Sequence, residues 1–152
     1  VGLPLVAAGG IADARGFAAA LMLGASGIQV GTRFLTAYEC NVHQNYKQMI
    51  LHAKDTDAVV SGRTTGHPVR SIKNRLTSKF KRMEKNNASL LELEKEGEGA
   101  LRRAAIEGDV KSGSVMAGQI AGMINKEESC EDIIVDLMEN TVKLIKNFRF
   151  EE

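Results

Sequence analysis

The sequence predicts an α/β fold in which a short parallel βαβ unit is followed by a mainly helical C-terminal region. An apolar run at 3–8, an amphipathic stretch at 14–23 and a second apolar run at 27–30 form a strand–helix–strand pattern, which is typical of parallel strands joined by a crossover helix. Both apolar runs end in glycine. From Ser78 onward the pattern is helical and increasingly charged. These observations place the parallel strands at the beginning of the chain and the helices after them.

Composition excludes several classes of protein. The 152 residues are 43% apolar and 26% charged, as in ordinary globular proteins, and the net charge of +1 predicts no general attraction to nucleic acid or membrane. The two cysteines, Cys40 and Cys130, form neither a CxxC motif nor a zinc pattern, which fits a reducing compartment and predicts no metal site. No apolar run or signal peptide predicts membrane insertion or export, so we expect a cytoplasmic protein.

The first residues predict a fragment. The chain begins with Val1 rather than Met and is already in an apolar strand by Leu5. A buried parallel strand needs neighbours on both sides. We therefore expect that the beginning of the protein is missing from this chain.

Local signals define the βαβ elements. Pro4 lies near the start of the first strand, where a missing N–H is tolerated, and Asp13 is a candidate N-cap for the helix at 14–23. Gly24 occupies the expected C-cap position of that helix. The second strand ends in Gly31 and Thr32. The two strands are therefore expected to be parallel neighbours.

Further signals divide the remainder of the chain. Asn41 with Gln44 predicts a capping box, and 57–61 and 69–72 read as short strands that flank the loop "GRTTGHP". We expect three regions: 1–56 with the last barrel-like β/α units, 57–82 with the short strands and a basic loop, and 83–152 with the helical C-terminal part.

Within that last region, Ser89 with Glu92 and Ser129 with Asp132 are helix-start signatures. The segment "SVMAGQIAGMI" after the turn "GDVKSG" is expected to be a helix of small residues. The final helix is expected to bury one apolar side, made of Ile133, Ile134, Leu137, Met138, Val142 and Ile145.

The paired glycines after the first strand have two possible explanations: a turn that needs glycine dihedrals, or close approach of a ligand to the backbone. A second glycine follows the second strand, and the carboxyl ends of parallel strands lie at one edge of a sheet. In (β/α)8 barrels the loops after strands seven and eight commonly bind phosphate, and a helix N-terminus can contribute roughly 0.3–1 kcal/mol for an anion. The combination favours a phosphate site, with tight turns as the structural alternative.

Four segments resemble one family over nearly the whole chain. They are "AAGGIADARGFAAALMLGASGIQVGTRFL", "HQNYKQMILHAKDTDAVVSGR", "GHPVRSIKN" and "EGDVKSGSVMAGQIAG". They resemble the nitronate monooxygenase and 2-nitropropane dioxygenase superfamily, and within it the flavin-dependent enoyl-acyl-carrier-protein reductase II. The block "MAGQIAG" discriminates this family from other phosphate-binding barrels. The resemblance implies the C-terminal part of a TIM (β/α)8 barrel, with its last two β/α units, because a whole barrel takes about 250 residues.

The resemblance also implies a cofactor and its contacts. The reductase takes hydride from NADH or NADPH through FMN and reduces the 2,3-double bond of an enoyl thioester. Carried onto matching positions, the residues that hold the FMN phosphate are Ala8, Gly9, Gly10, Gly31 and Thr32. Those near the flavin ring or the phosphoribityl chain are Met116, Gly118 and Gln119, in the segment near 114–122.

No residue of this chain is assigned a catalytic role. The histidine that the family places near the flavin belongs to an earlier strand, and His43, His52 and His67 are expected to have surface or packing roles. Cys40 is expected to pack as a small hydrophobe. Arg33 and Glu39, beside the second glycine loop, either orient that loop or serve in capping or in a salt bridge. Two rivals remain: a nitronate monooxygenase, and a non-catalytic fragment that binds a phosphate ligand.

The expected partner is acidic. The stretch 63–82 holds basic residues and no acidic one: Arg63, Arg70, Lys73, Arg75, Lys79, Lys81 and Arg82. Such a patch can attract an acidic partner although the net charge is near zero. The resemblance implies an acyl carrier protein as that partner and a homodimer for the full-length enzyme. A basic but merely solvated helix is the alternative.

Overall fold

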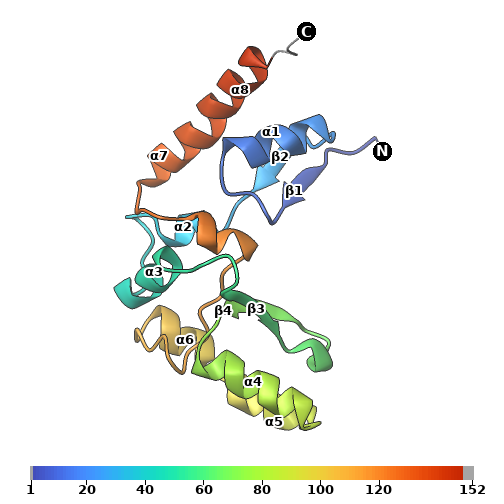
Figure 1. Ribbon diagram of the computed structural model, residues 1–152, viewed down its shortest axis with the longest axis vertical. Coiled ribbons are helices and arrows are strands. Elements are labelled where there is room, and N and C mark those ends of the chain that lie inside the picture. Colours follow the sequence, from blue (N-terminus) through green and yellow to red (C-terminus); the bar gives the residue numbers. More distant parts are fainter. Residues whose placement is uncertain (1, 149–152) are drawn as a thin grey trace. The chain divides into compact units, whose positions relative to one another are not determined.

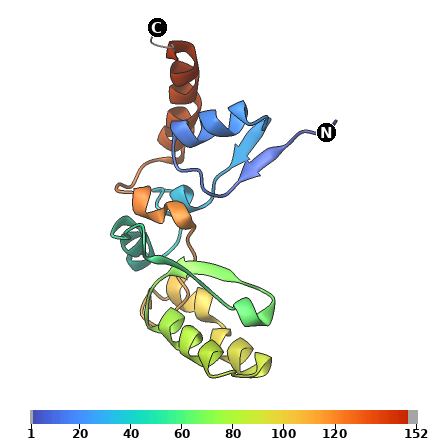
Figure 2. The ribbon, with the colours of Figure 1, turned by 45° about the vertical axis from the view of Figure 1, so that its right-hand side comes forward.

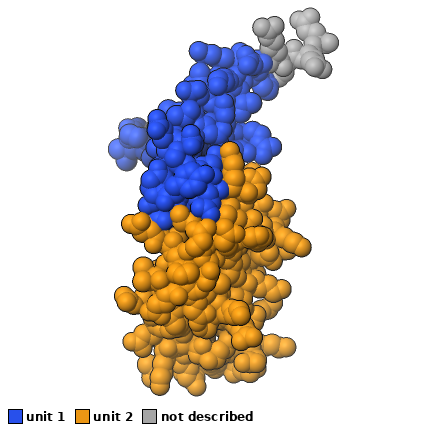
Figure 3. Space-filling view, turned by 90° about the vertical axis from the view of Figure 1, so that its left-hand side faces the viewer, with its two compact units in different colours: residues 1–40, 127–152 blue, residues 41–126 orange. Residues whose placement is uncertain are grey.

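The chain forms two compact units, which a computed structural model describes over residues 2–148 (Figure 1). One unit consists of residues 1–40 and 127–152, and the other of residues 41–126, as coloured in Figure 3. The first unit is thus closed by the C-terminal part of the chain. The division into the three regions 1–56, 57–82 and 83–152, which we expected from the sequence, stays a prediction.

The first unit contains the expected βαβ arrangement. β1 (Val6–Ala8) and β2 (Gly27–Gln29) are parallel, and α1 (Ala14–Met22) connects them. The pairing runs from Val6 opposite Gly27 to Ala8 opposite Gln29. Asp13 caps α1 through its carboxylate, as expected, and a single helical turn, α2 (Thr32–Leu35), follows β2. Because the two strands are parallel, their carboxyl ends lie at the same edge of the sheet.

Two C-terminal helices complete the first unit. α7 (Cys130–Val135) passes through a π-helical turn (Asp136–Asn140) into α8 (Thr141–Asn147), and α8 packs against α1. Phe17, Ala37, Ile133 and Leu137 form the core.

The prediction that one whole apolar side of this last helix is buried is wrong in part. Ile133 and Leu137 are buried, whereas Ile134, Met138, Val142 and Ile145 are 38–54% exposed. Within the described residues the helix packs mainly against α1, and α2 contacts only its first part, α7, so these neighbours cover only part of so wide an apolar stripe.

The second unit is built on a β-hairpin. β3 (Ala58–Ser61) and β4 (Val69–Ile72) are antiparallel, with a short 3-10 helix η1 (Arg63–Thr65) between them. Figure 2 shows α4 (Arg75–Lys85) and α5 (Leu90–Gly97) side by side below this hairpin. α3 (Gln44–Leu51) and α6 (Ala100–Ala105) complete the helices. The capping box at Ser89 forms as expected.

The segment "SVMAGQIAGMI" is not the expected helix. Ser71 and Met116 form an antiparallel bridge, because the N–H of Ile72 donates to the carbonyl of Val115 and the N–H of Ala117 donates to the carbonyl of Arg70. The segment therefore satisfies the free edge of β4 before it turns into a 3-10 helix, η2 (Gln119–Met123). Pairing with a strand edge outweighed the weak helix propensity of a glycine-containing run.

Two helix starts also differ from the expectation. The N-cap of α3 is His43, whose Nδ1 accepts a hydrogen bond from the N–H of Asn45, so Asn41 does not form the capping box. α4 begins at Arg75 rather than near Ser78, because Asn74 and Thr77 form a reciprocal capping box. Among residues 2–148 no helix is both long and apolar enough to cross a lipid bilayer.

Candidate anion site at two glycine loops

The first glycine loop directly follows β1. Gly9 and Gly10 have φ angles of +89° and +75°, the left-handed region in which a side chain is strained. A Cβ atom at either position would meet no atom within 4 Å. The dihedrals alone therefore explain these two glycines, and the space around them is open to a ligand.

The second loop lacks such a dihedral requirement. Gly31 has φ −112° and ψ −60°, which any residue can adopt, and a Cβ there would also meet no atom within 4 Å. Neither turn geometry nor packing within the described chain requires glycine at this position. A group outside the described chain that approaches the backbone would require it. Gly31 is therefore the position at which the two explanations of the glycines can be separated.

The two loops lie at one edge of the two-stranded sheet. Ala8 of β1 pairs with Gln29 of β2, so the chain leaves both strands at the same edge of the sheet. Gly9 directly follows Ala8, and Gly31 lies two residues after Gln29. Ala8, Gly9, Gly10 and Gly31 are exposed, and Thr32 is half-buried. The structure thus brings together these five residues expected at a phosphate.

Helix ends contribute less to this site than expected. α2 has only four residues, so the aligned peptide dipoles behind Thr32 are few. At α1, the carboxylate of Asp13 already accepts hydrogen bonds from the N–H groups of Arg15 and Gly16. An anion in this place would therefore be held by loop amides and the Thr32 hydroxyl rather than by a helix field.

Arg33 joins the two glycine loops. Its side chain is 10% exposed, and Nη1 donates to the carbonyl of Ala12, 3.0 Å away, just after the first loop. Nη1 also reaches Asp136 at 2.7 Å, and Nη2 reaches Glu128 at 3.0 Å. Because Arg33 itself begins next to the second loop, this one side chain ties both loops to the C-terminal segment. Of the alternatives left open from the sequence, the structure shows the salt bridges, and an orienting role of Arg33 toward the loops stays a prediction.

The charges in this network hold one another ionised. Burial would raise the pKa of Asp136, but hydrogen bonds from Arg33 and Asn140 and the positive charge of Arg33 outweigh it, and the pKa lies below its ordinary value. The sequence could not reveal this network, because Glu128 and Asp136 lie 95 and 103 residues from Arg33 along the chain. The position of Arg33 beside the glycine loop was the only signal.

The other residues expected near the flavin lie in the second unit. Met116 is 37% exposed, and its carbonyl accepts a 2.7 Å hydrogen bond from the Tyr46 hydroxyl. Gly118 precedes η2, and the exposed Gln119 donates its side-chain amide to the carbonyl of Asp55 at 3.5 Å. These three residues form one continuous strand-to-turn segment, and their contact with a flavin stays a prediction.

The histidines have local structural contacts. His43 caps α3, His52 pairs through Nδ1 with the carbonyl of Gln48, and the N–H of His67 donates to Thr65 Oγ1. The Glu39 carboxylate accepts from the N–H of Cys130, which places it at the start of α7 rather than at the glycine loops.

Both cysteines pack against the core of the first unit. Burial and the neighbouring Glu39 carboxylate raise the pKa of the Cys130 thiol, which disfavours the reactive thiolate. Among residues 2–148 no three His, Cys, Asp or Glu side chains are grouped to hold a metal ion.

Fold and site together define an α/β protein with two open glycine loops at the carboxyl edge of two parallel strands. The family model for nitronate monooxygenase matches residues 1–140, so the chain belongs to the nitronate monooxygenase family.

Individual relatives agree with this assignment. A probable nitronate monooxygenase of Staphylococcus saprophyticus is 48% identical over 80 residues, covering 53% of this chain and 22% of the relative. The structure of FabK from Thermotoga maritima is 42% identical with a TM-score of 0.90, covering 96% of this chain and 46% of that one. A nitroalkane oxidase of Streptomyces ansochromogenes is 27% identical with a TM-score of 0.77, covering 97% and 42%. The chain thus spans less than half the length of these relatives.

Proposed function

We propose that this chain supplies the FMN phosphate-binding part of a flavin-dependent oxidoreductase that reduces the 2,3-double bond of an enoyl-acyl-carrier-protein. NADH or NADPH would provide the hydride. The loops of this chain would hold and orient FMN, which would supply the hydride-transfer chemistry between the nicotinamide and the enoyl thioester. The similarity to FabK, an enoyl-acyl-carrier-protein reductase II, covers 96% of this chain and supports the reductase activity.

Gly31 is the observation that carries the proposal. Its dihedrals do not need glycine and its surroundings do not crowd a Cβ, as is also true of Gly27, but Gly31 follows β2 at the edge where Gly9 follows β1, and a phosphate bound there would approach its backbone. A phosphate oxygen hydrogen-bonded to the loop amides would take the space of that Cβ. The loop after β1 lies at the same edge with open space over Gly9 and Gly10. The residues present therefore fit a phosphate group.

Replacement of this glycine tests the proposal in the complete protein that contains this chain. Gly31→Ala should weaken FMN binding by roughly 10- to 100-fold, which corresponds to the loss of one hydrogen bond to a charged group. Its thermal unfolding should be unchanged or slightly improved, since alanine reduces the entropy of the unfolded chain by about 0.4–1 kcal/mol at a compatible position. Fluorescence titration with FMN measures the affinity.

Gly27→Ala is the matched control. Gly27 lies at the other end of β2, has no positive φ and would also meet no atom with a Cβ. It should retain full FMN affinity. If both variants bind FMN like the parent protein, the two loops do not hold the phosphate.

A nitronate monooxygenase is the second candidate, because the family model and the probable nitronate monooxygenases carry that description. Single-turnover measurements separate the two activities. Rapid flavin reduction by NADH followed by reoxidation with crotonyl thioester supports the reductase, whereas turnover of alkyl nitronates without NADH supports the monooxygenase. Absence of both reactions in a flavin-loaded protein would leave the non-catalytic phosphate-binding role.

The charge distribution on α4 supports an acidic carrier as the substrate-bearing partner. Lys73, Asn74, Arg75, Ser78, Lys79 and Arg82 line one concave part of the surface. Lys79 is paired with Glu96 on α5, whereas no ion pair among the described residues neutralises Lys73, Arg75 or Arg82. These positive charges can attract an acyl carrier protein and lose that effect beyond the Debye length of roughly 8 Å at physiological salt.

A further inference from the structure

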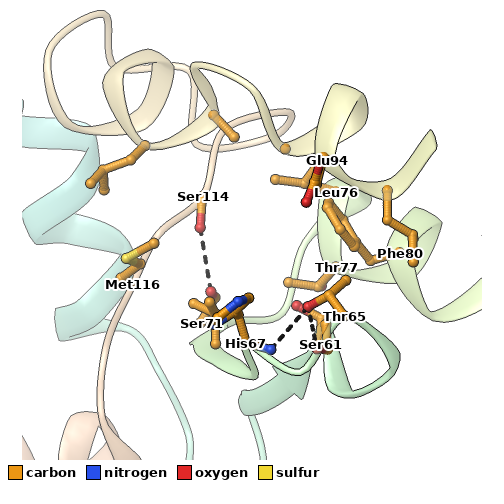
Figure 4. Close-up of a pocket in the computed structure, with 16 residues that line it drawn as sticks. Ser61, Thr65, His67, Ser71, Leu76, Thr77, Phe80, Glu94, Ser114 and Met116 are labelled. Atoms are coloured by element: carbon orange, nitrogen blue, oxygen red, sulfur yellow. Dashed lines mark hydrogen bonds between the residues drawn. The ribbon is translucent and has the colours of Figure 1, made fainter. Parts of the chain in front are cut away.

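The second unit contains a cavity that the anion site does not use. Its volume is about 240 Å³, and the hairpin β3–β4, the helices α4 and α5 and the segment around Met116 enclose it. Figure 4 shows Met116 on one side of it, Leu76 and Phe80 on the other, and the pair Ser71 and Ser114 between them. Leu76 and Leu93, which line it, are almost fully buried. The surface that these residues present to the cavity is mostly apolar.

Four hydroxyl groups that line this cavity, those of Thr65, Ser71, Thr77 and Ser114, have partners in the chain. Thr65 Oγ1 donates to the carbonyl of Gly62 at 2.7 Å and accepts from the N–H of His67. Thr77 Oγ1 donates to the carbonyl of Asn74, and Ser71 and Ser114 bond to each other. These groups do not need a polar ligand. A ligand that enters would gain chiefly by the burial of apolar surface.

The size of the cavity sets the kind of apolar group. An apolar cavity of about 150 Å³ is large enough for benzene, so this larger cavity has room for a chain of at least about six carbons. Glu94 lines it with a carboxylate, which repels the charged end of an anionic lipid. Met116 provides an adaptable side chain at the other side, as the thioether does at surfaces that accept varied apolar groups.

We propose that this cavity of the second unit is a binding site for an unbranched aliphatic chain of about six or more carbons. The methyl end enters between Leu76, Phe80 and Leu93, and the polar end stays outside. Two sources have this chemistry, the acyl group of a thioester substrate and a free lipid. The first rests on the proposed function, because it makes the cavity the acyl-chain site of the reductase.

Uncharged primary alcohols from butanol to decanol test the cavity in the 152-residue chain. Each added methylene should tighten binding about fourfold until the cavity is full, since one buried methylene contributes about 0.8 kcal/mol. Methyl NMR should show the largest shifts at Leu76, Leu93 and Met116. Equal affinities along the series, or shifts elsewhere, would overturn the proposal.

Two valines of the hairpin provide a matched pair of variants. Val69 lines the cavity, whereas Val60 pairs with the neighbouring Arg70 and does not line it. Val69→Phe should fill part of the space and weaken octanol binding at least tenfold, and Val60→Phe should bind like the parent chain. Thermal unfolding checks that both variants fold. Equal octanol binding by both folded variants would contradict this assignment of the site.

Kinetics in the complete protein distinguish the two sources. If the acyl group is the ligand, Val69→Phe lowers kcat/KM for a ten-carbon enoyl thioester and leaves that for crotonyl thioester unchanged. If a free lipid is the ligand, both thioesters react as with the parent while octanol binding still falls. A protein without any thioester turnover would contradict the proposed reductase but leave the alcohol series as a valid test of the cavity.

Discussion

Removal of the Arg33 guanidinium should destabilise the first unit much more than its loss of packing suggests. Arg33→Met keeps most of the aliphatic stem but removes the guanidinium that pairs with both Glu128 and Asp136. The Glu128 side chain is 13% exposed and that of Asp136 is 32% exposed, so water can compensate Asp136 in part and Glu128 hardly at all. Breaking a fully buried pair costs about 3–5 kcal/mol, and the lower end of that range, about 3 kcal/mol, applies here.

Amide hydrogen exchange measures this loss unit by unit. The N–H groups of Phe17 and Ile133 are hydrogen-bonded in the first unit, and that of Ile72 is hydrogen-bonded in the second. A loss of about 3 kcal/mol should accelerate exchange at Phe17 and Ile133 by roughly 100-fold if they exchange through global opening of that unit. Exchange at Ile72 should stay unchanged.

Neutral partners provide the control for charge. Combining Arg33→Met with Glu128→Gln and Asp136→Asn removes the uncompensated charges and should recover more than half of the lost protection. If Arg33→Met alone leaves exchange within threefold of the parent chain, the network does not hold the loops to the C-terminal segment. If the triple variant is no better than the single one, the cost is lost packing and not unpaired charge.

Three shorter predictions concern the same surfaces. Gly10→Val in the complete protein should abolish FMN retention with much of the fold intact, and a yellow preparation with unchanged flavin stoichiometry would refute the site. Lys81→Glu combined with Arg82→Glu should raise KM for carrier-bound substrate, an effect that salt diminishes, while a small enoyl thioester reacts as before. Equal losses with both substrates would assign these residues to structure. Because the folded-state pKa of Asp136 lies below its ordinary 3.8, the stability it contributes is complete above that value and lost as the pH falls through the lower one. Asp136→Asn should therefore be less stable at pH 7 and show a smaller loss of stability on acidification below about pH 4, as followed by urea unfolding.

The sequence was informative wherever neighbouring residues decide the structure. The βαβ pattern, the hairpin strands and the caps at Asp13, Ser89 and Ser129 all formed as expected, because each depends on hydrogen bonds or side-chain spacing within a few residues. The glycine loops could also be placed, because the parallel order of two strands fixes which of their ends meet. The family assignment followed from these same segments and their resemblance.

Long-range pairing explains what the sequence did not predict. The small-residue run around Met116 has no strong local preference, and the free edge of β4 decided its backbone. The apolar cavity beside Met116 depends on side chains from the hairpin and from two helices, which no local spacing brings together. The partners of Arg33 could not be predicted either, because Glu128 and Asp136 lie far from it in the sequence, although Arg33 itself was recognised as a neighbour of the glycine loop.

The structure separates the two explanations of the glycines because it assigns them to different positions. Gly9 and Gly10 satisfy a turn, since their φ angles are positive, and they would be glycine even if no ligand existed. Gly31 satisfies no turn and relieves no contact in the described chain, so it is the glycine at which the proposed phosphate contact can be tested. In the proposed phosphate site Arg33 would keep the two loops at their spacing, because it follows one loop in the chain and donates to the carbonyl of Ala12 beside the other. A phosphate site at this edge therefore needs both the empty space at Gly31 and the buried cation next to it.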